Sequence, residues 1–75
     1  MGKVSYTYVS MQLGENMRME REKQGISLRK LGLMTGLDYT NLSNIENGKG
    51  NPTVQTLSKI AVSLDIDLAT LFKGA

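Results

Sequence analysis

The chain has 75 residues and a formal net charge of +2, and it contains no cysteine and no histidine. Disulfide bonds and thiolate chemistry are therefore excluded, and the commonest metal ligand and general base is missing. No apolar stretch approaches the roughly 20 residues that cross a bilayer, and the N-terminus lacks the apolar core of a signal peptide. We expect one small cytoplasmic domain that is not an enzyme, with no cofactor, metal, membrane association or small-molecule ligand.

The positive charge is concentrated in the middle of the chain. From residue 23 to residue 59, five cationic residues stand against two acidic ones, whereas the remaining residues carry a slight negative excess. A domain of this length has a core that gives only marginal stability, so a partner subunit often contributes. We therefore expect either a tightly packed helical bundle or an oligomer.

The N-terminal segment MGKVSYTYVS fits no helical pattern. We predict an arm over residues 1–10 that lies on the domain or is disordered, because a lone strand would have no partner. The domain itself is predicted over residues 11–75. Its first helix runs from about Met11 to Gln24, with Leu13 and Met17 on one stripe and a glycine after its end.

Two short helices are predicted next, joined by the turn TGLD. Ser27 is a good N-cap for the second helix, which buries Leu31 and stops at Gly36. Gly32 is expected where the two helices approach closely and only a minimal side chain fits. Two short helices with a glycine at the corner are typical of a helix-turn-helix.

The third helix, residues 38–47, has an unusual composition. Asp38 is a good N-cap, and Leu42 and Ile45 are expected to face the core. The outer face carries uncharged hydrogen-bonding side chains, which rank poorly in helix interiors because they compete for the backbone. These residues are Tyr39, Thr40, Ser43, Asn44 and Asn47.

Two more helices complete the pattern. Thr53 caps a fourth helix, and Asp67 caps a short fifth one. The fourth helix has an apolar face of five residues, namely Val54, Leu57, Ile60, Ala61 and Leu64. The last third of the chain has more apolar side chains than a small core can bury, so we expect Ile66 and Leu71 in a homodimer interface and Leu64, Leu68 and Phe72 in the monomer core.

The chain resembles the lambda-repressor-like (Cro/repressor, XRE-type) helix-turn-helix proteins from Leu13 to Lys73. The resemblance rests on the array G-x-S-x-x-x-L-G-x-x-x-G-L, read from GISLRKLGLMTGL, and on the I-E-N-G that ends the third helix. It implies an all-α fold of five helices and a transcriptional regulator that binds a palindromic operator in double-stranded DNA as a homodimer. One relative class is the controller protein of restriction-modification operons.

The resemblance also implies roles for individual residues. The recognition helix falls on residues 38–47, with Tyr39, Thr40, Asn44 and sometimes Ser43 reading bases, because such amides, hydroxyls and methyls match base edges in the major groove. Phosphate contacts are expected from the following residues: Ser27, Leu28, Arg29, Asn47 and Lys49. Relatives commonly carry glutamine where this chain has Leu28, so the backbone amide and Ser27 are expected to contribute more there.

The resemblance further implies a shielded ion pair between Arg21 in the first helix and Glu46 at the end of the third. Tyr6 and Tyr8 are expected to cover the core, with a groove-reaching arm as the alternative. An antitoxin or a protein-interaction module with the same fold is the rival function. The short C-terminus favours a self-contained regulator, and the sequence leaves activation and repression equally open.

Overall fold

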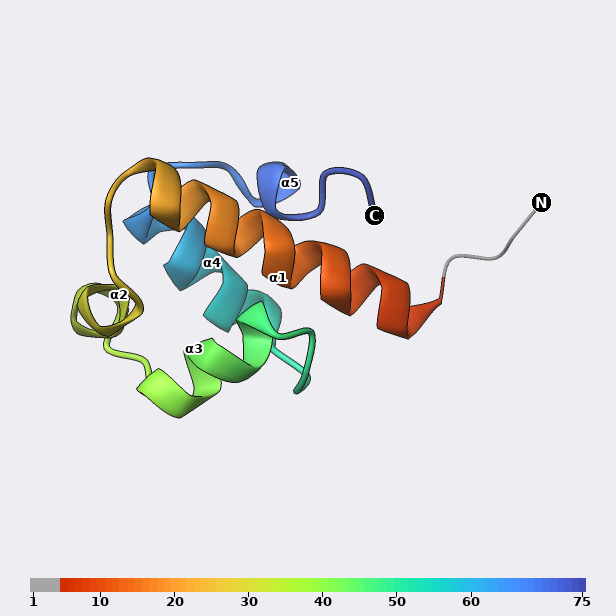
Figure 1. Cartoon of the computed structure of the whole chain (residues 1–75), viewed down its shortest axis with the longest axis horizontal. Helices are drawn as coiled ribbons and strands as arrows, with labels where there is room; N and C mark the ends of the chain where they lie inside the picture. Colours follow the sequence, from red (N-terminus) through yellow and green to blue (C-terminus); the bar gives the residue numbers. More distant parts are fainter. Residues whose placement is uncertain (1–4) are drawn as a thin grey trace.

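The computed structural model describes residues 5–75, and in these residues it contains five α-helices and no strand. The helices are α1 (Tyr6–Lys23), α2 (Leu28–Thr35), α3 (Tyr39–Glu46), α4 (Val54–Ser63) and α5 (Leu68–Leu71). Figure 1 shows that α1 crosses the molecule, with α5 on one side of it and α3 on the other. The predicted all-α architecture of five helices is confirmed.

The start of α1 differs from the prediction. The Ser5 hydroxyl accepts a hydrogen bond from the Tyr8 amide at 3.0 Å, and this N-cap starts the helix at Tyr6. The predicted non-helical arm is therefore wrong for residues 6–10, while residues 1–4 lie outside the described residues. Alternating Tyr, Thr, Tyr and Val side chains suggested a strand, but a helix accepts them at modest cost once its first turn is capped.

The short helices begin where the sequence places their caps. Side chains accept a backbone amide three residues on at 3.0–3.1 Å in three cases, namely Ser27, Thr53 and Asp67. Asp38 holds the N-cap position of α3, but its side chain makes no cap hydrogen bond. The first residues of α2, α4 and α5 are thus set by local hydrogen bonds.

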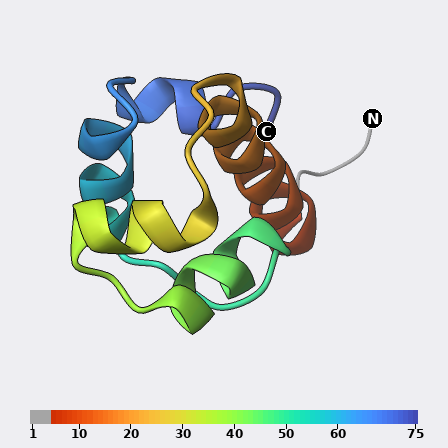
Figure 2. The same ribbon diagram turned by 60° about the vertical axis from the view of Figure 1, so that its left-hand side comes forward.

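The core lies where all five helices meet. α1 packs against α3 and α5, α2 against α3 and α4, and α4 against α5. Figure 2 shows this ring of helices around the centre of the molecule. The buried apolar residues are Leu13, Met17, Leu31, Leu42, Ile45, Leu57, Ile60, Ala61, Leu64 and Leu71. Val54, expected on the buried face of α4, is 69% exposed because it is the first residue of that helix.

The C-terminal residues correct the predicted dimer interface. Leu71 is fully buried in the monomer, whereas Phe72, which we placed in the core, is 36% exposed. Leu68 and Leu71 are three residues apart in α5, so they share the face that packs on the core. Phe72 follows the end of that single turn and leaves this face. The prediction of Leu71 as an interface residue is therefore wrong, and Ile66 is half-buried against the core.

Gly14 allows α1 and α3 to approach closely. A Cβ at this position would collide with the backbone carbonyl groups of Ile45 and Glu46. Gly32, the glycine expected at a close approach, is less crowded, since its Cβ would lie 3.3 Å from the Leu37 carbonyl oxygen. The carboxyl end of α3 is therefore set directly against the α1 backbone.

Within residues 5–75, none of the helices combines the length and the apolar character that a membrane crossing requires.

Candidate nucleic-acid interface

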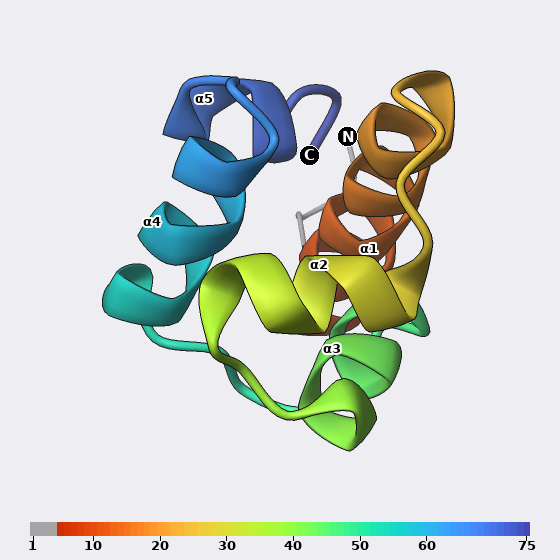
Figure 3. The same cartoon turned by 90° about the vertical axis from the view of Figure 1, so that its left-hand side faces the viewer.

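The turn between α2 and α3 is held by a compact set of hydrogen bonds. Gly36 ends α2 with φ of 75°, and its amide donates to the Gly32 carbonyl at 2.9 Å. The Thr35 hydroxyl donates to the Leu31 carbonyl at 2.8 Å and accepts from the Leu37 amide at 3.1 Å. Figure 3 shows α2 and α3 lying one below the other on one side of the molecule. The turn therefore fixes the orientation of α3 relative to α2.

The two faces of α3 have different environments. Leu42 and Ile45 are almost completely buried, and they anchor the inner face in the core. The outer face is exposed at Tyr39, Thr40 and Asn44. Ser43 is half-buried beside them, and Asn41 is a further exposed amide that we did not single out from the sequence. The result is a row of uncharged hydrogen-bonding side chains on a rigid helix.

Arg29 on α2 and Tyr39 on α3 are brought together. The guanidinium carbon of Arg29 lies 5.5 Å from the centre of the Tyr39 ring. This cation–π distance is worth about 0.5–1 kcal/mol at an exposed site. Both side chains are exposed, so the contact orients the ring without removing either group from the surface.

The first turn of α2 contributes backbone amides and cations. Ser27 is exposed and caps the helix, and Arg29 and Lys30 are exposed beside it. Leu28 is half-buried and its side chain packs against the core. At position 28, therefore, only the backbone amide is suited to contact a ligand at the helix N-terminus.

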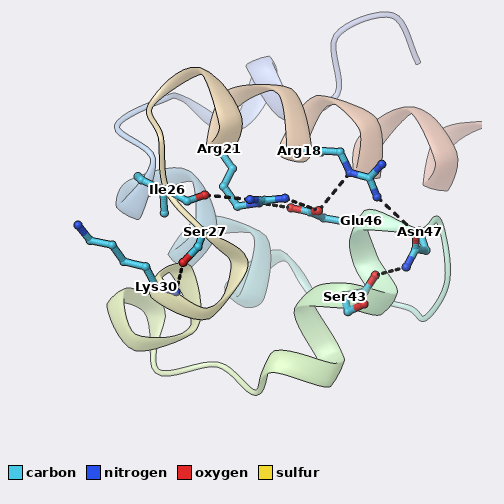
Figure 4. A network of polar contacts seen from close by, with 8 residues as sticks. All are labelled: Arg18, Arg21, Ile26, Ser27, Lys30, Ser43, Glu46 and Asn47. Atoms are coloured by element: carbon cyan, nitrogen blue, oxygen red, sulfur yellow. Dashed lines mark hydrogen bonds and ion pairs between the residues drawn. The ribbon is translucent and has the colours of Figure 1, made fainter.

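The expected ion pair between Arg21 and Glu46 is present in the structure (Figure 4). Arg21 donates to the two carboxylate oxygens of Glu46 at 2.7 and 3.0 Å, a bidentate arrangement. A third donor of the same guanidinium reaches the Ile26 carbonyl at 2.9 Å. Only 12% of the Arg21 side chain and 3% of the Glu46 side chain are exposed. The hydrogen bonds to Glu46 raise the pKa of Arg21 above its ordinary value.

Arg18 is a member of this network that we did not predict. It donates to Glu46 and to the Asn47 side-chain oxygen, both at 3.4 Å. The Asn47 amide group donates to the Ser43 carbonyl at 2.9 Å, so both ends of this side chain are engaged inside the protein. The signal in the sequence was the three-residue spacing of Arg18 and Arg21, which places both on the face of α1 that meets α3.

Lys49 follows the end of α3 and is exposed. Its backbone amide donates to the Asn44 carbonyl at 2.8 Å, which ties the loop to α3. Tyr6 and Tyr8 do not cover the core as expected, because they are 63% and 49% exposed and their hydroxyls bond to loop carbonyls. Among residues 5–75, no three acidic residues lie together as a metal site requires.

Comparisons with known proteins agree with this geometry. A helix-turn-helix family model (HTH_3) matches residues 17–71. The chain is 36% identical to the HTH-type transcriptional regulator SlrR of Bacillus subtilis over 61 residues, which are 80% of this chain and 40% of SlrR. This chain therefore spans less than half the length of that relative.

Solved structures give the same result. The restriction-modification controller protein C.AhdI from Aeromonas hydrophila is 31% identical, with a TM-score of 0.80 over 83% of this chain and 94% of that chain. The biofilm regulator SinR, solved in complex with DNA, is 35% identical, with a TM-score of 0.74 over 79% of this chain and 95% of that chain. On its sequence and its fold, the chain belongs to the helix-turn-helix family HTH_3.

Proposed function

We propose that this protein is a sequence-specific transcriptional regulator that binds a palindromic operator as a homodimer, with α3 in the major groove. The exposed outer face of α3 is the observation that carries the proposal. A helix anchored by buried leucine and isoleucine has no structural need for three exposed hydrogen-bonding side chains in a row. Such groups are the ones that distinguish base pairs in the major groove.

Individual side chains suit different parts of a base pair. The Asn44 amide can donate to and accept from adenine at the same time, which makes it the strongest candidate for direct readout. Thr40 offers a hydroxyl and a methyl group, and the methyl can contact thymine. The Tyr39 ring is oriented by Arg29 and can make an apolar contact at the start of the helix. Ser43 is half-buried beside these positions and has a short side chain, so it would reach a base edge only at close approach.

Phosphate contacts would flank this reading surface. The free amides at the start of α2, next to Ser27 and Leu28, form an anion site, and Arg29 and Lys30 add charge beside it. Lys49 adds a cation on the far side of α3. Asn47 is a weaker candidate, because Arg18 and the Ser43 carbonyl already hold its side chain. The SinR structure, solved in complex with DNA, supports DNA binding by a domain of this fold.

The homodimer follows from the limited reach of one recognition helix. α3 has eight residues and can contact only a few base pairs, too few to define a rare site. Two copies related by a two-fold axis would present their recognition helices about 34 Å apart, one turn of DNA. The C-terminal third supplies apolar surface for this contact at Val62, which is 79% exposed, Phe72 and half-buried Ile66.

Selection of binding sites from random duplex DNA tests the proposal directly. We expect the full chain to enrich a palindrome whose half-site centres lie about 10 base pairs apart. The matched control is Asn44→Ala, which should lose enrichment at one position of each half-site while other positions remain. Enrichment of a single half-site would overturn the dimer, and no enrichment at all would favour a protein-binding module and overturn the proposal.

A further inference from the structure

Two tyrosines in the first turn of α1 reach two segments that are distant in the sequence. The Tyr6 hydroxyl donates to the Gly50 carbonyl at 2.7 Å, across 44 residues. The Tyr8 hydroxyl donates to the Gly74 carbonyl at 2.7 Å, across 66 residues. Both rings are exposed, so the hydroxyl groups, and not apolar burial, account for the placement of these tyrosines. The first turn of α1, which precedes the matched family segment, thus carries specific long-range bonds.

The loop that Tyr6 reaches is the one that carries Lys49. It leaves α3 through the bond from the Lys49 amide to the Asn44 carbonyl, and it then passes Gly50, where φ is 81°. Glycine has more accessible backbone conformations than any other residue, so the loop needs an external restraint to keep one conformation. The Tyr6 hydroxyl supplies this restraint at the residue after Lys49.

Two further contacts show that α1 supports this loop along its length. Met11 packs against the loop, because a Cβ at Gly48 would lie 3.0 Å from the Met11 Cγ. Seven residues further along α1, the Arg18 side chain donates to the Asn47 side-chain oxygen. Tyr6, Met11 and Arg18 therefore meet successive parts of the loop between α3 and α4. Of these three, Tyr6 touches the loop farthest from the recognition helix, where α3 itself no longer restrains it.

We propose that Tyr6 is a positioning residue for DNA binding: its hydroxyl holds the α3–α4 loop in the conformation in which Lys49 meets a phosphate. This inference rests on the proposed function of the protein as a DNA-binding regulator. Tyr6 itself does not read bases in this arrangement. It limits the loop to one conformation before binding, and preorganisation of this kind improves affinity without a new contact to the ligand.

Amide hydrogen exchange in the free protein tests the positioning part without DNA. Tyr6→Phe removes one hydroxyl from an exposed ring and leaves the fold intact. We expect the amides of Lys49, Gly50 and Asn51 to exchange about two- to tenfold faster, the range that one net hydrogen bond provides. Tyr8→Phe is the matched control, since it removes the same group from the same helix and should leave these amides unchanged. Equal exchange in wild type and Tyr6→Phe would overturn the inference.

Binding to a short duplex of random sequence tests the link to DNA. Tyr6→Phe should weaken binding about two- to tenfold and flatten the salt dependence, while Tyr8→Phe should do neither. In a Lys49→Ala background, Tyr6→Phe should have no further effect. If Lys49→Ala itself leaves binding unchanged, the phosphate contact in the proposed function is wrong. If Lys49→Ala weakens binding and Tyr6→Phe does not, the positioning role alone is wrong.

Discussion

At the scale of single residues, Arg21 joins three segments of the chain. Its guanidinium holds Glu46 at the end of α3 and the Ile26 carbonyl before α2, while its backbone belongs to α1. A planar fork of donors can satisfy two carboxylate oxygens and a carbonyl at once, whereas a lysine ammonium is a point charge on a flexible stem. The position of α3 therefore depends on one arginine that stays charged at all physiological pH values.

Removal of either partner of this pair should be costly. Arg21→Ala leaves Glu46 buried beside Arg18 alone, and Glu46→Ala leaves the Arg21 guanidinium without its carboxylate. We expect each to lower the free energy of unfolding by about 3 kcal/mol, the lower end for a broken buried pair, because Arg21 keeps a little exposure. Urea denaturation of both single variants and the double variant gives the coupling energy. Additive losses in the double variant would show that the two residues do not act as a pair.

Asn44 and Lys49 should differ in how they affect DNA binding. Asn44→Ala removes the proposed base contact, so we expect a loss of about 1–3 kcal/mol on the selected operator and almost none on random DNA. Lys49→Ala removes the proposed phosphate contact, so it should weaken binding to both DNAs and reduce the salt dependence by about one ion. Titrations at several salt concentrations separate the two. The division of roles fails if both variants behave alike on the two DNAs.

At the scale of elements, the contact of α1 with α3 is a contact between backbones. Most helix pairs are separated by interlocking side chains, but the Gly14 position leaves no room for even a methyl group. The end of α3 is consequently fixed by steric exclusion at Gly14 and by charge at Arg21. Neither interaction involves the outer face of α3, so the exposed residues of that face can change without altering the support.

Gly14→Ala tests this close approach. Alanine favours a helix by about 1 kcal/mol over glycine, yet here its Cβ would force α1 and α3 apart. We expect a net loss of about 1–3 kcal/mol in the free energy of unfolding, the usual cost of an overpacked site. Gly32→Ala is the matched control, since its Cβ has more room and should cost less. Stability of Gly14→Ala equal to or above that of wild type would mean that the helices can separate freely.

The cap of α5 should make stability depend on acidity. Hydrogen bonds from the Thr70 hydroxyl and the Thr70 amide lower the pKa of Asp67 below its ordinary value. A lowered pKa in the folded state gives stabilisation above the unfolded pKa of about 4, which is lost as the pH falls through the folded value. Asp67→Asn keeps a cap oxygen but does not titrate. Its stability should therefore fall less than that of wild type between pH 5 and about 2.

Thr70→Val supplies the second arm of this test. It removes the hydroxyl that bonds to Asp67 at 2.7 Å and retains the shape of the side chain. The acid loss of stability should then lie between those of wild type and Asp67→Asn. Superimposable pH profiles for all three proteins would contradict the role of the cap.

The sequence predicted the elements whose ends are set locally. Ser27, Gly36, Thr53 and Asp67 act on amides and carbonyls within a few residues, so pattern alone located α2, α4 and α5. The start of α1 was missed because Ser5 was not recognised as a cap before an alternating segment. Within the candidate site, the exposed face of α3 followed from its spacing. The contacts of Arg18 and Tyr6 did not, because they join residues far apart in the chain.

The exchange of roles between Leu71 and Phe72 has a similar origin. Both are large apolar residues near the end of the chain, and composition does not distinguish them. Their burial depends on where the single turn of α5 ends. Leu71 is the last residue of the helix and is buried, whereas Phe72 is the next residue and is exposed. A helix so short gives too few periods for a reliable assignment of faces.

At the scale of the whole molecule, polar side chains of α1 and of its C-cap residue bond to the carboxyl ends of the last two helices. The Asn16 amide donates to the carbonyls of Leu71 and Lys73 at 2.9 and 2.8 Å, and the Gln24 amide donates to the Leu64 carbonyl at 2.6 Å. Helix ends leave such carbonyls without partners inside the helix. α1 therefore packs against α5 on one side and α3 on the other, as Figure 1 shows, and Gln24 at its carboxyl end bonds to the end of α4.

The proposed dimer can be tested on the exposed residues of the C-terminal third. Val62→Asp and Phe72→Asp introduce charge at an apolar contact, and each should shift the protein from dimer to monomer without unfolding it. Val54→Asp is the matched control, because Val54 is 69% exposed but lies at the other end of α4. Sedimentation equilibrium at micromolar concentrations gives the oligomeric state. A wild-type chain that stays monomeric under these conditions would remove the dimer from the proposal.

Because α1 packs between α3 and α5, the distance between these two helices is fixed. Packed helix axes lie about 8–10 Å apart, and here the spaces are filled by buried side chains and closed by Gly14, Asn16 and Arg21. A dimer joined near α5 would therefore hold its two copies of α3 at a nearly fixed separation. One base pair inserted between the half-sites moves the second by about 3.4 Å and turns it by about 35°. A rigid domain cannot follow that displacement. Such a regulator would therefore discriminate operators by the spacing of their half-sites as strictly as by their base sequence.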